Sequence, residues 1–131
     1  AIEWSNFSKG RWKTTHKRDE DDAYYDYEKI TNWFEDRWIV CENIYWVTHT
    51  ENIWRWTYTC SNSDCTEQFI NWIKGTFEYY MSEINDDYQP HYKSIMNDYF
   101  TQIWIWFAIE KTNNDYYKYY LTVHYCTKLI D

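Results

Sequence analysis

Polar and apolar positions follow the spacing of an amphipathic helix most clearly between Asp64 and about Ile84. Glu67 lies three residues after Asp64, which is the spacing of a capping box with Asp as the cap. The predicted apolar stripe consists of Phe69, Ile70, Ile73, Phe77, Tyr80, Met81 and Ile84. Steps of three and four residues predict a helix here, because a strand would need strict alternation.

The segment from Pro90 to Lys111 follows the same spacing, and Pro90 suits a first helical turn. Its stripe consists of Tyr92, Ile95, Met96, Tyr99, Phe100, Ile103 and Phe107. The run of Trp104, Ile105 and Trp106 widens the apolar arc near the end of the segment. We interpret the arc as the core face of a helix, with a partner-binding patch as the alternative.

Two further helices are predicted. One follows the acidic run of residues 19–22, whose charges complement a helix N-terminus, and buries Tyr27, Ile30, Phe34 and Trp38. The other runs from its cap at Asn114 to about Leu129. The pattern leaves two possible buried faces, one with Tyr116, Tyr120, Val123 and Thr127 and one with Tyr117, Leu121 and His124.

Residues 44–60 fit two structures. Trp54, Trp56, Tyr58 and Cys60 alternate with Arg55, Thr57 and Thr59, as they would in a strand. Thr48 and Glu51, however, have the spacing of a capping box that could begin a helix. We interpret the segment as helical.

Glycine occurs only at positions 10 and 75 and proline only at 90, whereas an eight-stranded barrel needs many turns rich in both. The fold expected from these patterns is all-α, a small antiparallel bundle of four to five helices held by two disulfides. Residues 1–131 are expected to form one disulfide-stapled helical domain, in which residues 1–21 are an extended N-terminal segment.

Composition shows what the core is made of and which partners it disfavours. The chain has 10 Trp and 15 Tyr, so aromatic rings replace the usual aliphatic side chains. Its net charge of −8 argues against nucleic acid and anionic membranes as partners, because phosphate binding needs clustered cations. No apolar run is long enough to span a membrane.

Four cysteines form an even set without C-x-x-C spacing, namely Cys41, Cys60, Cys65 and Cys126. Two disulfides are therefore expected rather than a zinc site, and they favour a secreted, extracellular protein. Asn6 begins the triplet Asn-Phe-Ser, a possible glycosylation site that agrees with secretion.

The expected bundle also predicts how the cysteines pair. Cys60 and Cys65 flank a short loop at one end of the bundle, and the antiparallel path carries Cys126 to the far end. A helical path from Cys41 to Cys60 covers about 28 Å, which places Cys41 at the far end too. The expected pairs are therefore Cys41 with Cys126 and Cys60 with Cys65.

Motifs of enzymes with known chemistry are absent from the sequence. It contains no phosphate loop, dinucleotide fingerprint, nucleophile elbow or H-E-x-x-H pair. Its histidines, His16, His49, His91 and His124, are scattered, and Glu110 beside the tryptophans is the most suggestive acid. We expect no enzymatic activity, no cofactor and no metal.

Two family resemblances imply different folds. Gly10-Arg11-Trp12 and Asp115-Tyr116-Tyr117-Lys118-Tyr119 resemble the G-x-W and D-Y-x-x-Y motifs of lipocalins, which implies a β-barrel that carries a small apolar ligand. The cysteines and tyrosines also resemble the two cysteine-tyrosine-cysteine motifs of the bicycle effectors of gall-forming aphids. That match uses Cys41 with Tyr45 or Tyr58 and Cys60, then Cys65 with Tyr125 and Cys126. It implies a secreted salivary protein that acts inside plant tissue.

Two functions are therefore expected, in order. The first is that of an effector-like secreted protein that binds a host or partner macromolecule, with protein as the expected partner. The alternative is a carrier of a small apolar ligand in an aromatic-lined cavity. The candidate binding residues for either are Trp104, Trp106, Trp54 and Trp56.

Overall fold

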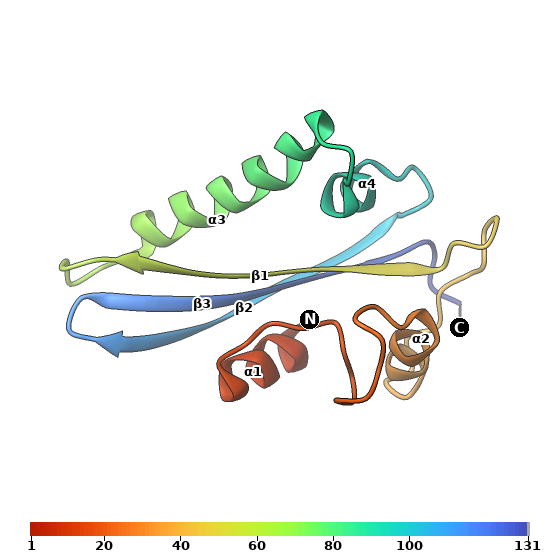
Figure 1. The fold of residues 1–131 in the computed structure, drawn as a ribbon, viewed down its shortest axis with the longest axis horizontal. Helices are drawn as coiled ribbons and strands as arrows, with labels where there is room; N and C mark the ends of the chain where they lie inside the picture. The colour runs from red at the N-terminus through yellow and green to blue at the C-terminus, as the bar shows by residue number, and fades with distance from the viewer. Residues whose placement is uncertain (131) are drawn as a thin grey trace.

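The computed structural model describes residues 1–130, which form a three-stranded antiparallel sheet between two layers of helices (Figure 1). Along the chain the elements are α1 (Ile2–Arg11), α2 (Tyr27–Glu35), β1 (His49–Thr59), α3 (Thr66–Ser82), the 3-10 helix η1 (Glu83–Asn85), α4 (Pro90–Met96), β2 (Gln102–Asn113) and β3 (Tyr116–Cys126). The strand order is β1-β3-β2, so the last strand lies in the middle. Helices α3 and α4 lie on one side of the sheet, and α1 and α2 lie on the other.

The central strand β3 supplies core residues to both faces. Tyr119, Leu121 and Val123 belong to the cluster packed beneath α3, where the ring of Phe69 lies 5.8 Å from that of Tyr119. Side chains at the alternate positions of β3 point to the α1 and α2 side. Because helices cover both faces and strands flank both edges, every residue from 119 to 126 is buried.

The expected all-α bundle is wrong. The segment interpreted as helical at 44–60 contains β1, the predicted helix from 114 to 129 is β3, and only Pro90–Met96 of the predicted helix from 90 to 111 is helical. For β3 the physical reason is burial on two sides, because a strand covered on both faces loses its polar alternation and becomes a continuous apolar run. Strand β2 is largely exposed but carries apolar side chains on both faces, so it shows no alternation either. The lipocalin-like barrel is wrong as well, since the sheet of the described residues is open, with β1 and β2 as its edges.

Scarcity of glycine did not prevent a tight hairpin. Asn114 and Asp115 form a two-residue turn between β2 and β3, and Asn114 takes a positive φ of 21°. Asparagine tolerates this conformation better than other residues with a side chain. The aromatic residues Tyr45 and Trp46 also adopt positive φ, in a turn closed by hydrogen bonds between Ile44 and Val47.

The predicted helix at 64–84 is confirmed as α3, and a helix does follow the acidic run, α2. Of the residues that this second helix was predicted to bury, Ile30 and Phe34 are buried. Tyr27 is exposed, and so is Trp38, which lies beyond the end of α2 at Glu35. The Asp64 carboxylate accepts a hydrogen bond from the amide of Thr66, 3.0 Å away. The predicted stripe of α3 is only partly covered, because Tyr80 is buried while Ile70 and Ile84 are exposed. The N-terminal segment, expected to be extended, contains helix α1.

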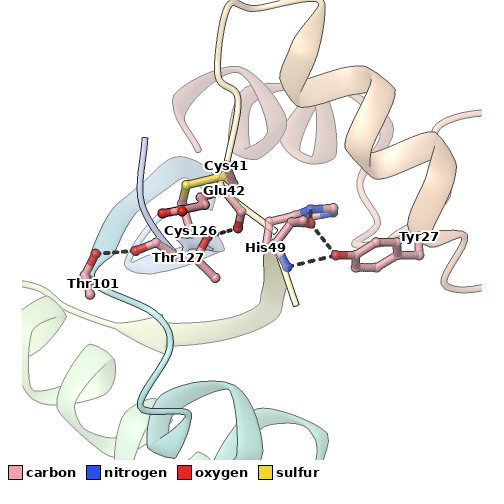
Figure 2. Close-up of a disulfide and its surroundings, with 8 residues drawn as sticks. Tyr27, Cys41, Glu42, His49, Thr101, Cys126 and Thr127 are labelled. Carbon is pink, nitrogen blue, oxygen red and sulfur yellow. Dashed lines mark hydrogen bonds between the residues drawn. A yellow bond between two sulfur atoms is a disulfide. The ribbon is translucent and has the colours of Figure 1, made fainter. Parts of the chain in front are cut away.

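Two disulfides tie the layers together, Cys41–Cys126 and Cys60–Cys65. These are the pairs expected from the sequence, although the bundle topology used to derive them is wrong. The first joins the loop after α2 to the end of β3, beside Thr127, whose hydroxyl donates to the carbonyl of Glu42 (Figure 2). Thr101 contacts the Thr127 carbonyl from the other side. The second links the end of β1 to the start of α3.

The disulfides should differ in their effect on stability. Cys41–Cys126 closes 85 residues and Cys60–Cys65 only 5, and the entropy removed from the unfolded chain grows with this separation. We expect replacement of the first pair by alanine to cost about 4 to 5 kcal/mol and of the second about 2 kcal/mol. Urea unfolding of the two double variants measures the difference, and peptide mapping without reductant checks the pairing. An equal loss of stability, or a peptide joining Cys41 to Cys65, would contradict the prediction.

Candidate functional site

A partly open cleft of about 730 Å³ lies along the outer edge of β1. Six consecutive residues of this strand, 50–55, line it and form its floor. One wall comes from the segment before α2 and consists of Thr14, His16, Tyr24 and Tyr25. The opposite wall comes from α4 and its flanking residues and consists of Tyr88, Pro90, His91, Lys93, Ser94, Asn97 and Phe100.

The floor of the cleft is an unpaired strand edge. The ladder to β3 uses the even-numbered residues of β1, as the 2.9 Å bonds from Thr127 N to Thr48 O and from Cys60 N to Asp115 O show at its two ends. In an antiparallel pair the alternate residues turn their backbone groups away from the partner strand. Ile53 and Arg55 therefore present their amide and carbonyl groups to the cleft. Within residues 1–130, no side chain or loop backbone hydrogen-bonds to the amide or carbonyl of Ile53 or Arg55; the bond from Arg55 to the Trp12 carbonyl uses its guanidinium.

A fully buried carboxylate, that of Glu51, anchors the N-terminal wall. Its Oε1 lies 2.9 Å from His16 Nδ1 and accepts from Arg18 Nη1 at 3.0 Å. Its Oε2 accepts from Arg18 Nη2 at 2.7 Å and lies 2.6 Å from His124 Nε2. Both oxygens thus have two partners each, which offsets the cost of burying the charge.

Aromatic rings enclose the cation of this cluster. The Arg18 guanidinium lies 3.8 Å from the ring centroid of Trp4 and 4.7 Å from that of Trp33. Cation–π contacts of this kind strengthen when water is excluded, and the Arg18 side chain is only 6% exposed. Residues 16–18 are therefore held between α1, α2 and β1.

Ionisation in the cluster follows from these contacts. Burial alone would raise the pKa of Glu51, but hydrogen bonds from His124, His16 and Arg18 outweigh it and hold the pKa well below its ordinary value. Burial lowers the pKa of His124, and it lowers that of nearby His49 from 6.5 to about 4. Glu51 is thus a charged anchor whose oxygens are all occupied, which suits it to positioning the wall rather than to catalysis.

The opposite wall has its own buried acid. Glu83 Oε2 accepts from the amides of His91 and Tyr92 at 2.9 and 3.0 Å, so it satisfies the first turn of α4. Its Oε1 lies 2.5 Å from His91 Nδ1, and the imidazole stacks on Tyr80 with 4.3 Å between ring centroids. Both walls are therefore fixed by a carboxylate that binds a histidine.

The four tryptophans expected to form a binding patch do not come together. Trp54 lines the cleft, and Trp56 lies 6.4 Å from it between ring centroids, on the α3 side of the sheet. Trp104 and Trp106 line a second pocket of about 440 Å³, beside the start of α1. They point to the other face of the sheet, because the register aligns them with His124 and Thr122.

The other residues considered from the sequence either lie outside the cleft or have a different role from the one expected. Glu110 accepts a hydrogen bond from Tyr120 at 3.3 Å, outside the cleft. Asn6 is exposed on α1. His16 and His124, judged scattered, meet at Glu51, which sequence reasoning took for a helix-capping residue. The signal that could have found Glu51 is the strand pattern of 54–60: extended back to 49, it places Glu51 and His49 on one face.

Comparisons with known proteins give no relative: no family model, no curated protein and no solved structure matches the chain. Among the described residues, no helix is long and apolar enough to cross a membrane. Over the same 130 residues, no group of three or more His, Cys, Asp or Glu side chains is arranged to hold a metal ion. The cleft therefore has to be interpreted from its own geometry.

Removing the charge of Glu51 should lower the free energy of unfolding far more than removing the charge of an exposed acid that also binds an arginine. Glu51→Gln leaves the buried Arg18 cation without its counter-ion, and we expect a loss of about 3 to 5 kcal/mol. Glu3→Gln is the matched control, because Glu3 also binds an arginine through both oxygens, that of Arg37, but is 60% exposed. It should cost less than about 1 kcal/mol. Urea unfolding measures both, and equal losses would contradict a structural role for the buried cluster.

Stability should rise with pH between about 4 and 6.5. His49 stays neutral in the folded protein down to a pKa of about 4, whereas it binds a proton near pH 6.5 when unfolded. The unfolded state therefore binds more protons in this range. Lowering the pH from 6.5 to 4 should reduce the free energy of unfolding by roughly 3 kcal/mol through His49 alone. His124 acts in the same direction. His49→Gln should flatten the pH dependence of the unfolding free energy, and an unchanged slope in this variant would contradict the assignment.

Proposed function

We propose that the protein is a binding module that takes an extended segment of a partner polypeptide against the open edge of β1. The observation that carries this proposal is the floor of the cleft, in which Ile53 and Arg55 turn free amide and carbonyl groups toward the ligand space. A strand added at this edge would bond to those groups and extend the sheet, a recurring mode of peptide recognition.

The dimensions of the cleft fit such a ligand. Six strand residues extend over about 20 Å, enough to pair with a segment of similar length. Successive side chains of an added strand point to opposite faces of the sheet, and the cleft has a wall on each face. Tyr25 marks one end of the open edge, because its hydroxyl lies 3.2 Å from the side-chain oxygen of Thr50.

Preorganised walls support binding further. Each wall is held by hydrogen bonds to a buried carboxylate, that of Glu51 on one side and that of Glu83 on the other. A binding site that is already ordered loses little conformational entropy when its ligand enters, so more of the contact energy appears as affinity. The two disulfides are consistent with action in an oxidising, extracellular compartment, and secretion is part of the proposal.

A small aromatic ligand is the second candidate. Tyr24, Trp54 and Phe100 place rings around the cleft, whose volume suits a molecule of drug size. Such a ligand would use the rings and leave the backbone groups of β1 to water. Polypeptide is the better fit, because a second backbone can pair with the outward amides and carbonyls of the floor, which a small aromatic ligand leaves unused.

The test begins with a displayed library of random linear peptides selected on the intact protein, followed by affinity measurements on the peptides recovered. Arg55→Pro removes one outward amide without breaking the ladder to β3, and we expect it to weaken peptide binding about tenfold beyond the effect of Arg55→Ala. Thr57→Pro is the matched control, because Thr57 has the same orientation on β1 but lies outside the cleft. It should leave affinity unchanged.

A second measurement does not depend on the variants folding. Methylating the backbone nitrogens of a recovered peptide one at a time should abolish binding at alternate positions only, as strand pairing requires. Failure to select any peptide, or tolerance of methylation at every position, would overturn the proposal. Retention of a small aromatic compound detected by native mass spectrometry would then favour the second candidate.

A further inference from the structure

The cleft has a charge opposite to that of the molecule around it. The chain carries 21 acidic and 13 basic residues, a net charge of −8. Among the cleft residues, Glu51 is the only acid, and Arg18 already neutralises it. Arg55 and Lys93 line the same cleft, and both are exposed.

The two cations lie on opposite sides of the cleft floor. Arg55 points to the side of the N-terminal segment, where its guanidinium donates to the carbonyl of Trp12. Lys93 belongs to α4, on the side where Trp54 packs near His91. An extended ligand on the floor therefore has one cation on each side of it.

Strand geometry converts this placement into a sequence preference. Neighbouring residues of a strand point to opposite faces, so two acids at odd spacing, such as adjacent or three apart, reach one wall each. Two acids at even spacing point to the same wall and can meet only one of the cations. Composition alone does not distinguish these two arrangements.

We infer that the segment bound in the cleft is acidic and carries two carboxylates at odd spacing, one for Arg55 and one for Lys93. This inference rests on the proposed function and names the class of polypeptide that the site selects. The net negative charge of the chain opposes an acidic partner at a distance, but solution ions screen that repulsion beyond about 8 to 10 Å. Recognition then depends on the contacts inside the cleft.

Synthetic peptides of identical composition test the inference directly. A peptide recovered from the library is resynthesised with its two acids at odd spacing, at even spacing, and replaced by glutamine. We expect the odd-spaced isomer to bind about three- to tenfold more tightly than the even-spaced isomer, and the glutamine peptide to be the weakest. Equal affinity for the odd- and even-spaced isomers would overturn the spacing.

Charge reversal in the protein identifies the cations. Arg55→Glu and Lys93→Glu should each weaken the acidic peptide by a similar factor, and a peptide with lysine at the matching position should recover the loss. Lys74→Glu is the control, because Lys74 is an exposed cation of α3 outside the cleft. The peptide isomers do not require these variants to fold.

The outcomes separate this inference from the proposed function. Selected peptides that are neutral, yet lose binding when their backbone is methylated, would overturn the acidic specificity and leave strand pairing intact. Absence of any bound peptide would overturn the proposed function itself. A single-stranded oligonucleotide that competes as effectively as the acidic peptide would show that the cleft binds anions in general and does not recognise an extended peptide. That result would also overturn the inference.

Discussion

The buried negative charge of Glu51 is the constraint on which the arrangement of the layers depends. An ionised carboxylate inside a protein is tolerated only when its oxygens are paired, and here the partners come from residues 16–18 and from the central strand. Rings of α1 and α2 then enclose Arg18. One charged group thereby sets the position of the N-terminal segment relative to the sheet, and with it one wall of the cleft.

Sequence patterns predicted the helices that keep one polar face and missed strands β2 and β3, which lack one. Helices α2 and α3 keep a polar face, so their period is visible. Strand β3 is buried on all sides from 119 to 126, and β2 carries apolar residues on both faces, so neither shows alternation. The alternation in β1 was visible, but the scarcity of glycine outweighed it. The assumption that tight turns require glycine fails here, because Asn114, Tyr45 and Trp46 adopt positive φ.

The candidate site was even less accessible to sequence reasoning, since its parts come from residues 14–25, 50–55 and 88–100. Of the four tryptophans expected to bind a partner, only Trp54 lines the cleft. Glu51 and Glu83 are unremarkable in sequence, because their roles arise from partners brought together by the fold. The disulfide pairs matched for a different physical reason: Cys41 meets Cys126 through the loop beside the end of the sheet, not at the end of a bundle.

The two edges of the sheet differ in how accessible they are to other strands. Strand β2 exposes Ile103, Ile105 and Ile109, and from residue 102 to 109 it lacks the charges that usually discourage pairing with other strands. Helix α1 contacts this strand at Trp106, whose carbonyl accepts a hydrogen bond from Ser5. The β1 edge is instead recessed between two walls, with the Tyr25 hydroxyl beside Thr50 at one end. A recessed edge admits a single extended segment but not a whole sheet. In the proposed function, the walls turn an edge that would otherwise favour aggregation into one that selects a single segment, and Arg55 and Lys93 restrict that segment to acidic sequences.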